Sequence, residues 1–211
     1  MAIVYRKFEP TEYVMKVQRG VTVKRGKGLS FFYNTMTTSL VVIPTTAFDS
    51  SFAFDDLMTA DYQKVSVQGD ISYAITDFDT AAKMINFDYR DGKKAYQEVL
   101  DSARNQMTRR IVNLMKVYIT KFVNGWEVRE AIRSQNELAG LLREAMKNDE
   151  MLAEYGLNVI AISILGILPQ PETRKALEAS AREEILKEQD DALYKRRNAA
   201  ILQERAIKEN E

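Results

Sequence analysis

Few side chains in this 211-residue sequence could perform covalent or acid–base chemistry. The chain contains neither histidine nor cysteine, which excludes thiol nucleophiles, disulfides, iron–sulfur clusters and most zinc sites. Histidine is also the side chain that most often transfers protons near neutral pH. Hydroxyl groups are plentiful between Thr35 and Ser39, but such a nucleophile needs a lysine or an amine as its base, and no spacing singles out a pair. We therefore expect no catalytic residues, no cofactor and no enzymatic activity; a hydrolase with a Ser–Lys pair is the least favoured alternative.

Two short patterns match ligand-binding motifs only in part. Gly26-Lys-Gly28 lacks the spacing and the terminal Lys-Ser/Thr of a phosphate-binding loop, so we interpret its glycines as tight-turn residues. Asp55, Asp56 and Asp61 carry oxygen ligands suited to a hard cation. They do not have the spacing of an EF-hand, and a solvated turn or a helix N-terminus is the favoured interpretation. We expect no metal site.

Basic side chains are concentrated in the first 30 residues. Seven lysines and arginines face two glutamates there, a local charge of +5, whereas the whole chain has 30 basic and 30 acidic residues. The overall balance argues against nucleic-acid binding, which needs a basic surplus. A basic face could rest on anionic lipid headgroups, at roughly 1 kcal/mol per basic residue; the alternative is a solvated strand surface. The residues predicted to contact lipid are Lys16, Arg19, Lys24, Arg25 and Lys27.

Aromatic residues follow the basic ones, in Phe31-Phe32-Tyr33 and again at Phe48, Phe52 and Phe54. Aromatic side chains in loops can insert at a bilayer interface. Aromatic side chains in strands more often form the core of a sheet, and we favour that interpretation here.

Strands are predicted up to about residue 76. The clearest is Lys64–Thr76, where apolar residues occupy odd positions and polar residues even ones, so one face should be buried. Gly69 falls on the apolar face, which predicts a bulge or a close packing contact. The run Leu40–Ile43 is continuously apolar and ends at Pro44, as in a strand buried on both faces.

Helical periodicity replaces the alternation after residue 76. We predict a short helix over Phe78–Asn86 and a long amphipathic helix over Tyr96–Phe122. Its apolar stripe recurs every three or four positions, at Tyr96, Val99, Leu100, Ala103, Met107, Ile111, Leu114, Tyr118 and Phe122. The segment Ser134–Glu137 has a capping-box pattern, and Gly156 is placed to end a helix. The segment Leu157–Leu168 is apolar at both odd and even positions, which predicts a buried strand.

Pro169-Gln-Pro171 separates a domain over residues 1–169 from a helix over residues 170–211. From Pro171 onward Ala, Glu, Lys, Leu and Arg supply 28 of 41 residues, a composition typical of a long helix or coiled coil. Apolar pairs recur there every seven residues, which favours association with partner helices; the alternative is a solvated helix folded back on its own domain. The predicted self-association residues are Ile185, Leu186, Ala192, Leu193, Ala199, Leu202 and Ile207.

Five segments, taken in order, resemble the SPFH or band 7 domain shared by stomatins, prohibitins and flotillins. The resemblance covers roughly the whole chain and implies an α+β fold: a mostly antiparallel sheet with packed helices, followed by a long C-terminal helix. The five segments are Gly20–Leu29, Val42–Thr45, Thr59–Gly69, Tyr155–Val159 and Pro169–Glu172.

The resemblance also implies a non-catalytic scaffold. Such proteins form homo-oligomers, often rings or cages on a membrane, organise membrane domains, and regulate membrane proteases or channels. The alternative is a soluble regulatory or chaperone-like subunit that binds a protease or another enzyme. The apolar anchor that precedes this domain in stomatins and prohibitins is not found before Tyr13, and the seven-residue pattern is intact at Glu211, so we expect a truncated coiled coil.

The expected location follows from composition. The absence of cysteine fits a reducing compartment. No stretch approaches the roughly 20 apolar residues that cross a bilayer. We therefore expect a cytoplasmic protein that is soluble or attached peripherally to a membrane.

Overall fold

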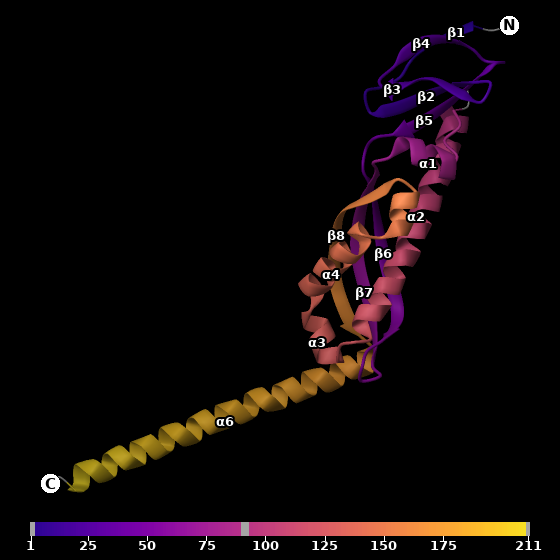
Figure 1. Cartoon of the computed structure of the whole chain (residues 1–211). Coiled ribbons are helices and arrows are strands. Elements are labelled where there is room, and N and C mark those ends of the chain that lie inside the picture. Colours follow the sequence, from indigo (N-terminus) through magenta and orange to yellow (C-terminus); the bar gives the residue numbers. More distant parts are fainter. Residues whose placement is uncertain (1–2, 90–92, 210–211) are drawn as a thin grey trace. The chain divides into compact units, whose positions relative to one another are not determined.

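The computed structural model describes residues 3–89 and 93–209, with backbone only at 93, 94 and 203–209 (Figure 1). Residues up to Ile167 form one compact unit, and those from Leu168 form a second. The chain has the predicted α+β fold, with antiparallel strands, packed helices and a long C-terminal helix.

The N-terminal part of the first unit contains two small antiparallel sheets. Strand β1 (Ile3–Lys7) pairs with β4 (Ser30–Asn34). Strand β2 (Glu12–Gln18) lies between β3 (Val21–Lys27) and β5 (Thr38–Pro44). The two sheets share one core, because apolar side chains on their facing sides meet there. This core contains Phe8, Val14, Phe31, Tyr33, Leu40 and Val42.

A third sheet has the strand order β6-β7-β8. Strands β6 (Phe48–Met58) and β7 (Lys64–Ile75) are antiparallel, and the predicted alternation of β7 is confirmed because its odd positions from Val65 to Ile75 are buried. Gly69 makes a close packing contact rather than a bulge. A Cβ there would overlap the Ser163 carbonyl oxygen of the neighbouring strand and lie 2.6 Å from the Phe52 ring.

Strand β8 (Leu157–Pro169) pairs with β7 in the antiparallel sense. The Thr76 N–H donates to the Gly156 carbonyl at 2.9 Å, and Gly69, seven residues earlier, lies against Ser163, seven residues later. Moving forward along β8 therefore means moving backward along β7, so the two strands are antiparallel.

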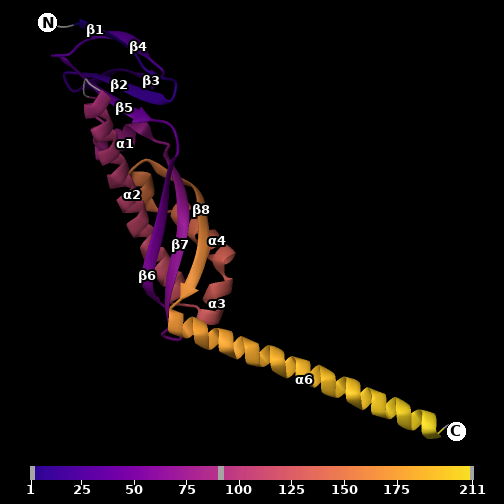
Figure 2. The same ribbon diagram turned by 180° about the vertical axis from the view of Figure 1, so that it is seen from behind.

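In the described part of the chain, five helices lie between β7 and β8: α1 (Phe78–Met84), α2 (Lys93–Val123), α3 (Val128–Arg133), α4 (Gln135–Lys147) and α5 (Glu150–Glu154). Figures 1 and 2 show α2, α3 and α4 on one side of the β6-β7-β8 sheet and α1 beside β5.

The buried stripe of α2 differs from the predicted one in its second half. Ala103, Met107 and Ile111 are buried as expected, but the stripe continues through Met115 and Ile119. The predicted positions one residue earlier, such as Leu114, are only half-buried. The buried residues recur every four positions because the helix lies along the sheet. The predicted periodicity was therefore correct, but in the second half of the helix the predicted buried positions were one residue too early.

Helix capping follows the prediction at one end only. Ser134 precedes α4 but makes no side-chain capping hydrogen bond, so the predicted capping box is wrong. Asp77 and Asp149 cap α1 and α5 instead, each accepting two backbone N–H groups. Gly156 follows Tyr155, the C-cap residue of α5, and has a φ of +65°. This agrees with the prediction that Gly156 ends a helix.

Strand β8 corrects another prediction, because its second face is exposed. Ile160 is 54% exposed and Leu165 is 66% exposed, whereas Leu157, Ile162 and Ile167 are buried. Buried positions change from odd to even and back to odd, so the alternation shifts twice within 13 residues. These shifts, rather than burial on both faces, explain the apolar residues at both parities.

The second unit is dominated by α6 (Pro171–Glu209), a single helix of 39 residues. From Arg182 to Leu202 every side chain is exposed. The helix therefore presents all of that stretch, apolar residues included, to its surroundings.

Candidate functional site

The five predicted lipid-contact residues all lie on the hairpin of β2 and β3. Lys16 is in β2 and Lys24, Arg25 and Lys27 are in β3. Arg19 is in the turn between them, where its φ is +51°. Strand β3 is at the edge of its sheet, and all its residues except Gly26 are exposed. The sequence thus places these charges on an accessible strand.

Lys16 and Lys24 form the more available part of this basic group. They are direct neighbours across the β2–β3 pair, and their ammonium nitrogens lie 5.2 and 5.8 Å from the centre of the Phe31 ring. Lys16 also donates to the Phe32 carbonyl at 3.1 Å, which leaves two of its donors for another acceptor. Two adjacent like charges favour an anion between or above them.

Arg25 and Lys27 face a different neighbour, helix α1. The Arg25 guanidinium pairs with the Asp79 carboxylate at 2.5 Å, and Lys27 lies 5.8 Å from the Phe78 ring centre. Residues 24 and 25 point to opposite sides of a strand because side chains alternate. The structure therefore brings Lys16 and Lys24 together and separates them from Arg25 and Lys27.

The strand β4, whose backbone Lys16 contacts, carries an exposed apolar surface on its outward face that was not predicted from the sequence. Along β1 and β4 the side chains alternate, so Phe31 and Tyr33 enter the core while Phe32 points outward and is 65% exposed. The Phe32 ring is 4.8 Å from the ring of Tyr5, its partner across the pair. We call this surface the β1–β4 outer face; its exposed members are Ile3, Tyr5 and Phe32.

The prediction that these aromatic residues form sheet core is correct except for Phe32. Phe52 and Phe54 are buried and stack at 5.3 Å between ring centres, and Phe48 is half-buried. Three consecutive aromatic residues in one strand cannot share a face. That alternation was the signal for an outward Phe32.

The predicted self-association residues of α6 are exposed wherever the structure describes their side chains. Ile185, Leu186 and Leu193 are each more than half exposed, as is Leu202. Ala192 and Ala199 are exposed as well. Ile207 lies outside the residues whose side chains are described.

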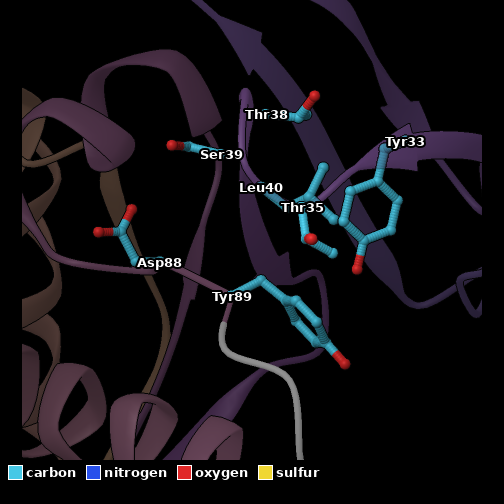
Figure 3. A pocket seen from close by; sticks show the side chains of 7 residues that line it. All are labelled: Tyr33, Thr35, Thr38, Ser39, Leu40, Asp88 and Tyr89. Carbon is cyan, nitrogen blue, oxygen red and sulfur yellow. The ribbon is translucent and has the colours of Figure 1, made fainter. Parts of the chain in front are cut away.

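One hollow of about 290 Å³ lies beside the end of β4 and the start of β5 (Figure 3). In the view of Figure 3, Asp88 and Ser39 lie to one side and Tyr33 and Thr35 to the other. Among the described residues its lining contains no lysine or arginine, so these residues supply no hydroxyl–base pair of the kind that nucleophilic catalysis needs.

Two of the three acidic residues considered as cation ligands have internal partners. Asp61 accepts the Thr59 hydroxyl at 2.6 Å and the Val128 N–H at 3.1 Å, which fixes the β6–β7 turn to α3. Asp56 pairs with Lys64 at 3.1 Å. Within residues 3–89 and 93–209, no group of three acidic residues is placed to hold a metal ion.

None of the helices in the described part of the chain is both long enough and apolar enough to cross a membrane. The model of the SPFH domain / Band 7 family matches residues 6–208. The chain therefore belongs to the SPFH/Band 7 family, which includes stomatins, prohibitins and flotillins. Family members commonly oligomerise and associate with membranes, and the family is generally non-enzymatic. A search of curated proteins found no match.

Proposed function

We propose that this chain is a non-catalytic scaffold that self-assembles through α6 and binds peripherally to the cytoplasmic face of an anionic membrane. The observation that carries the proposal is the pair Lys16 and Lys24 against β4, the strand whose outward side chain Phe32 belongs to the β1–β4 outer face. As a scaffold, the assembly would organise a membrane domain or regulate a membrane protease or channel.

Basic and aromatic side chains together fit a lipid interface better than either alone. The ammonium groups of Lys16 and Lys24 would face phosphate or carboxylate headgroups, at about 1 kcal/mol for each basic residue. Tyr5 and Phe32 are large exposed rings, and aromatic rings prefer the depth of the headgroups. Removing them from water would add to the electrostatic attraction.

One copy would bind weakly by this surface, so assembly is part of the mechanism. Leu186 and Leu193 are seven residues apart and exposed on α6, a spacing that suits contact with a neighbouring helix. Copies joined through such helices would present many lipid-binding surfaces at once. The second and later contacts then form at high effective concentration.

Vesicle flotation tests the lipid contact. The chain should float with vesicles of phosphatidylcholine and phosphatidylserine, should not float with phosphatidylcholine alone, and should be released by salt because screening weakens surface charges. The variant Lys16→Glu/Lys24→Glu should lose this binding. The control Lys116→Glu/Lys121→Glu makes the same charge change at exposed positions of α2 and should keep it.

Equal loss in both variants would show that only net charge matters, and the proposed surface would be wrong. An unmodified chain that stays unbound at low salt would instead favour a soluble regulatory or chaperone-like subunit.

A further inference from the structure

Strand β8 has an unusual edge. It is the last strand in the order β6-β7-β8, and no strand in the described part of the chain pairs with its outer side. None of its 13 residues is charged. Natural edge strands usually avoid pairing with other chains by carrying charges or by being very short. Strand β8 has neither protection, although its shifts in alternation add local twist.

The outward side chains of β8 are apolar where those of its neighbours are polar. Ile160 and Leu165 are more than half exposed, and Leu168 is 45% exposed. On the same side of the sheet, β7 presents Gln68 and Asp70. Figure 2 shows this side of the sheet in front of the helices. A strand that paired with the free edge of β8 would therefore bury these exposed apolar side chains.

We infer that β8 pairs, antiparallel, with β8 of a second copy of this chain. A twofold axis brings the same strand of both copies together, so the side chains of β8 must tolerate other side chains of the same strand opposite them. An uncharged strand meets that condition. Strand β6, at the other edge, does not, because Asp49, Asp55 and Asp56 would face like charges.

A membrane is a poorer occupant of this edge than a second copy. Asp49 and Asp70 are exposed on the same face of the sheet and would repel anionic headgroups. The pairing would also satisfy the backbone N–H and carbonyl groups on the outer side of β8, which lipid tails cannot do. The contact uses no residue of the predicted α6 seam, so it is a second and separate self-association surface.

Cross-linking tests the pairing directly, because the natural chain has no cysteine. Single cysteines would replace Asn158, Ile160, Ala161, Ser163 and Leu165 in turn, all exposed positions of β8. In an antiparallel pair, only residues near the axis face their own copy. Each further residue separates the two cysteines by about 7 Å more, twice the rise per residue, and a disulfide needs Cα atoms within about 7 Å.

We expect mild oxidation of the dilute 211-residue chain to give strong dimer cross-linking at one or two adjacent positions and a decline on both sides. Ala53→Cys on β6 and Val117→Cys on α2, both exposed, should cross-link no faster than random collision allows. Uniform cross-linking along β8 would mean parallel pairing and would overturn the proposal. So would cross-linking no faster than at the two control positions.

A second comparison separates this contact from the α6 seam. Ser163→Cys, or whichever position cross-links best, would be combined with Leu186→Asp/Leu193→Asp. Retained cross-linking is expected, because β8 contributes its own contact. Loss of cross-linking, with the helical circular dichroism signal of the folded chain unchanged, would show that β8 strands meet only as a by-product of helix association and would overturn the proposal.

Discussion

At the scale of single residues, Gly69 shows how closely the β6-β7-β8 sheet is packed. The Ser163 carbonyl and the Phe52 ring occupy the space that any side chain at Gly69 would need. The atoms in the way are backbone of an adjacent strand and a buried ring, and neither can move without disturbing the pairing of β7 with β8.

Replacing Gly69 with alanine should therefore lower the free energy of unfolding by about 1–3 kcal/mol, the usual cost of overfilling a packed site. Urea denaturation would measure it. Gly140→Ala is a matched control, because a Cβ at Gly140 in α4 meets nothing within 4 Å. That change should raise stability by about 0.5–1 kcal/mol, since glycine weakens helix interiors. Equal effects of the two changes would contradict the packing argument.

Tyr73 links the sheet to α2 and gives the fold a dependence on alkaline pH. Burial raises the pKa of its phenol, although the hydrogen bond with Thr108 and the charge of Arg104 oppose that effect. The two hydroxyl oxygens, of Tyr73 and Thr108, are 2.6 Å apart. Burial likewise raises the pKa of Tyr96. A group that holds its proton more tightly when folded stabilises the fold below its unfolded pKa.

Stability should thus be constant with respect to these tyrosines below about pH 10, the unfolded pKa of tyrosine, and should fall as the pH rises above it. The variant Tyr73→Phe should lose about 0.5–1.5 kcal/mol at pH 7 through the missing hydrogen bond. Its stability should then fall less steeply between pH 10 and pH 11 in urea titrations. A fall as steep as that of the natural chain would mean that Tyr73 does not contribute.

At the scale of elements, the sequence predicted the buried face of a strand correctly where apolar and polar residues alternate strictly. Strand β7 alternates over its whole length, and its buried face is the one predicted. Strand β8 could not be predicted in the same way, because its alternation shifts twice and its sequence then resembles a strand buried on both faces. The candidate lipid site was half predictable: its lysines follow from composition, but the outward Phe32 depends on which face of β4 meets the core.

Helix α6 leads to a prediction about its own exposed row. Leu186→Asp/Leu193→Asp should lower the mass of the assembly towards the 24.2 kDa of one chain, because charges in a helix seam oppose its burial. Light scattering coupled to size exclusion would measure the mass. Tyr194→Asp/Asn198→Asp adds the same charge at exposed positions on the other side of the helix and should leave the mass unchanged. An unchanged mass in the leucine variant would show that the seam is wrongly assigned.

At the scale of the whole molecule, charge is distributed unevenly along the chain. The first 30 residues carry +5, so residues 31–211 carry −5, because the total is zero. A protein with this separation is attracted to an anionic surface by its N-terminal part and repelled from it by the rest. Attraction and repulsion together would orient each copy.

If avidity sustains membrane binding, the α6 variant Leu186→Asp/Leu193→Asp should weaken vesicle binding although every lysine is intact. The loss should exceed tenfold in the vesicle concentration needed for half-maximal binding, since multivalent gains commonly reach 10²–10⁴-fold. Flotation at several lipid concentrations would measure it. Binding equal to that of the Tyr194→Asp/Asn198→Asp control would show that a single copy is sufficient.

The Gly156 carbonyl, which accepts N–H groups from Thr76 at 2.9 Å and Asp77 at 3.2 Å, has a consequence for synthesis. It joins positions 80 residues apart in the chain, so one side of β7 stays unpaired on the ribosome until five helices and then β8 have emerged. Pairing between such distant segments is slow, and an unpaired strand is prone to aggregate. Nascent chains that stop before residue 157 should therefore bind chaperones that hold exposed strands, and extension past residue 169 should release them.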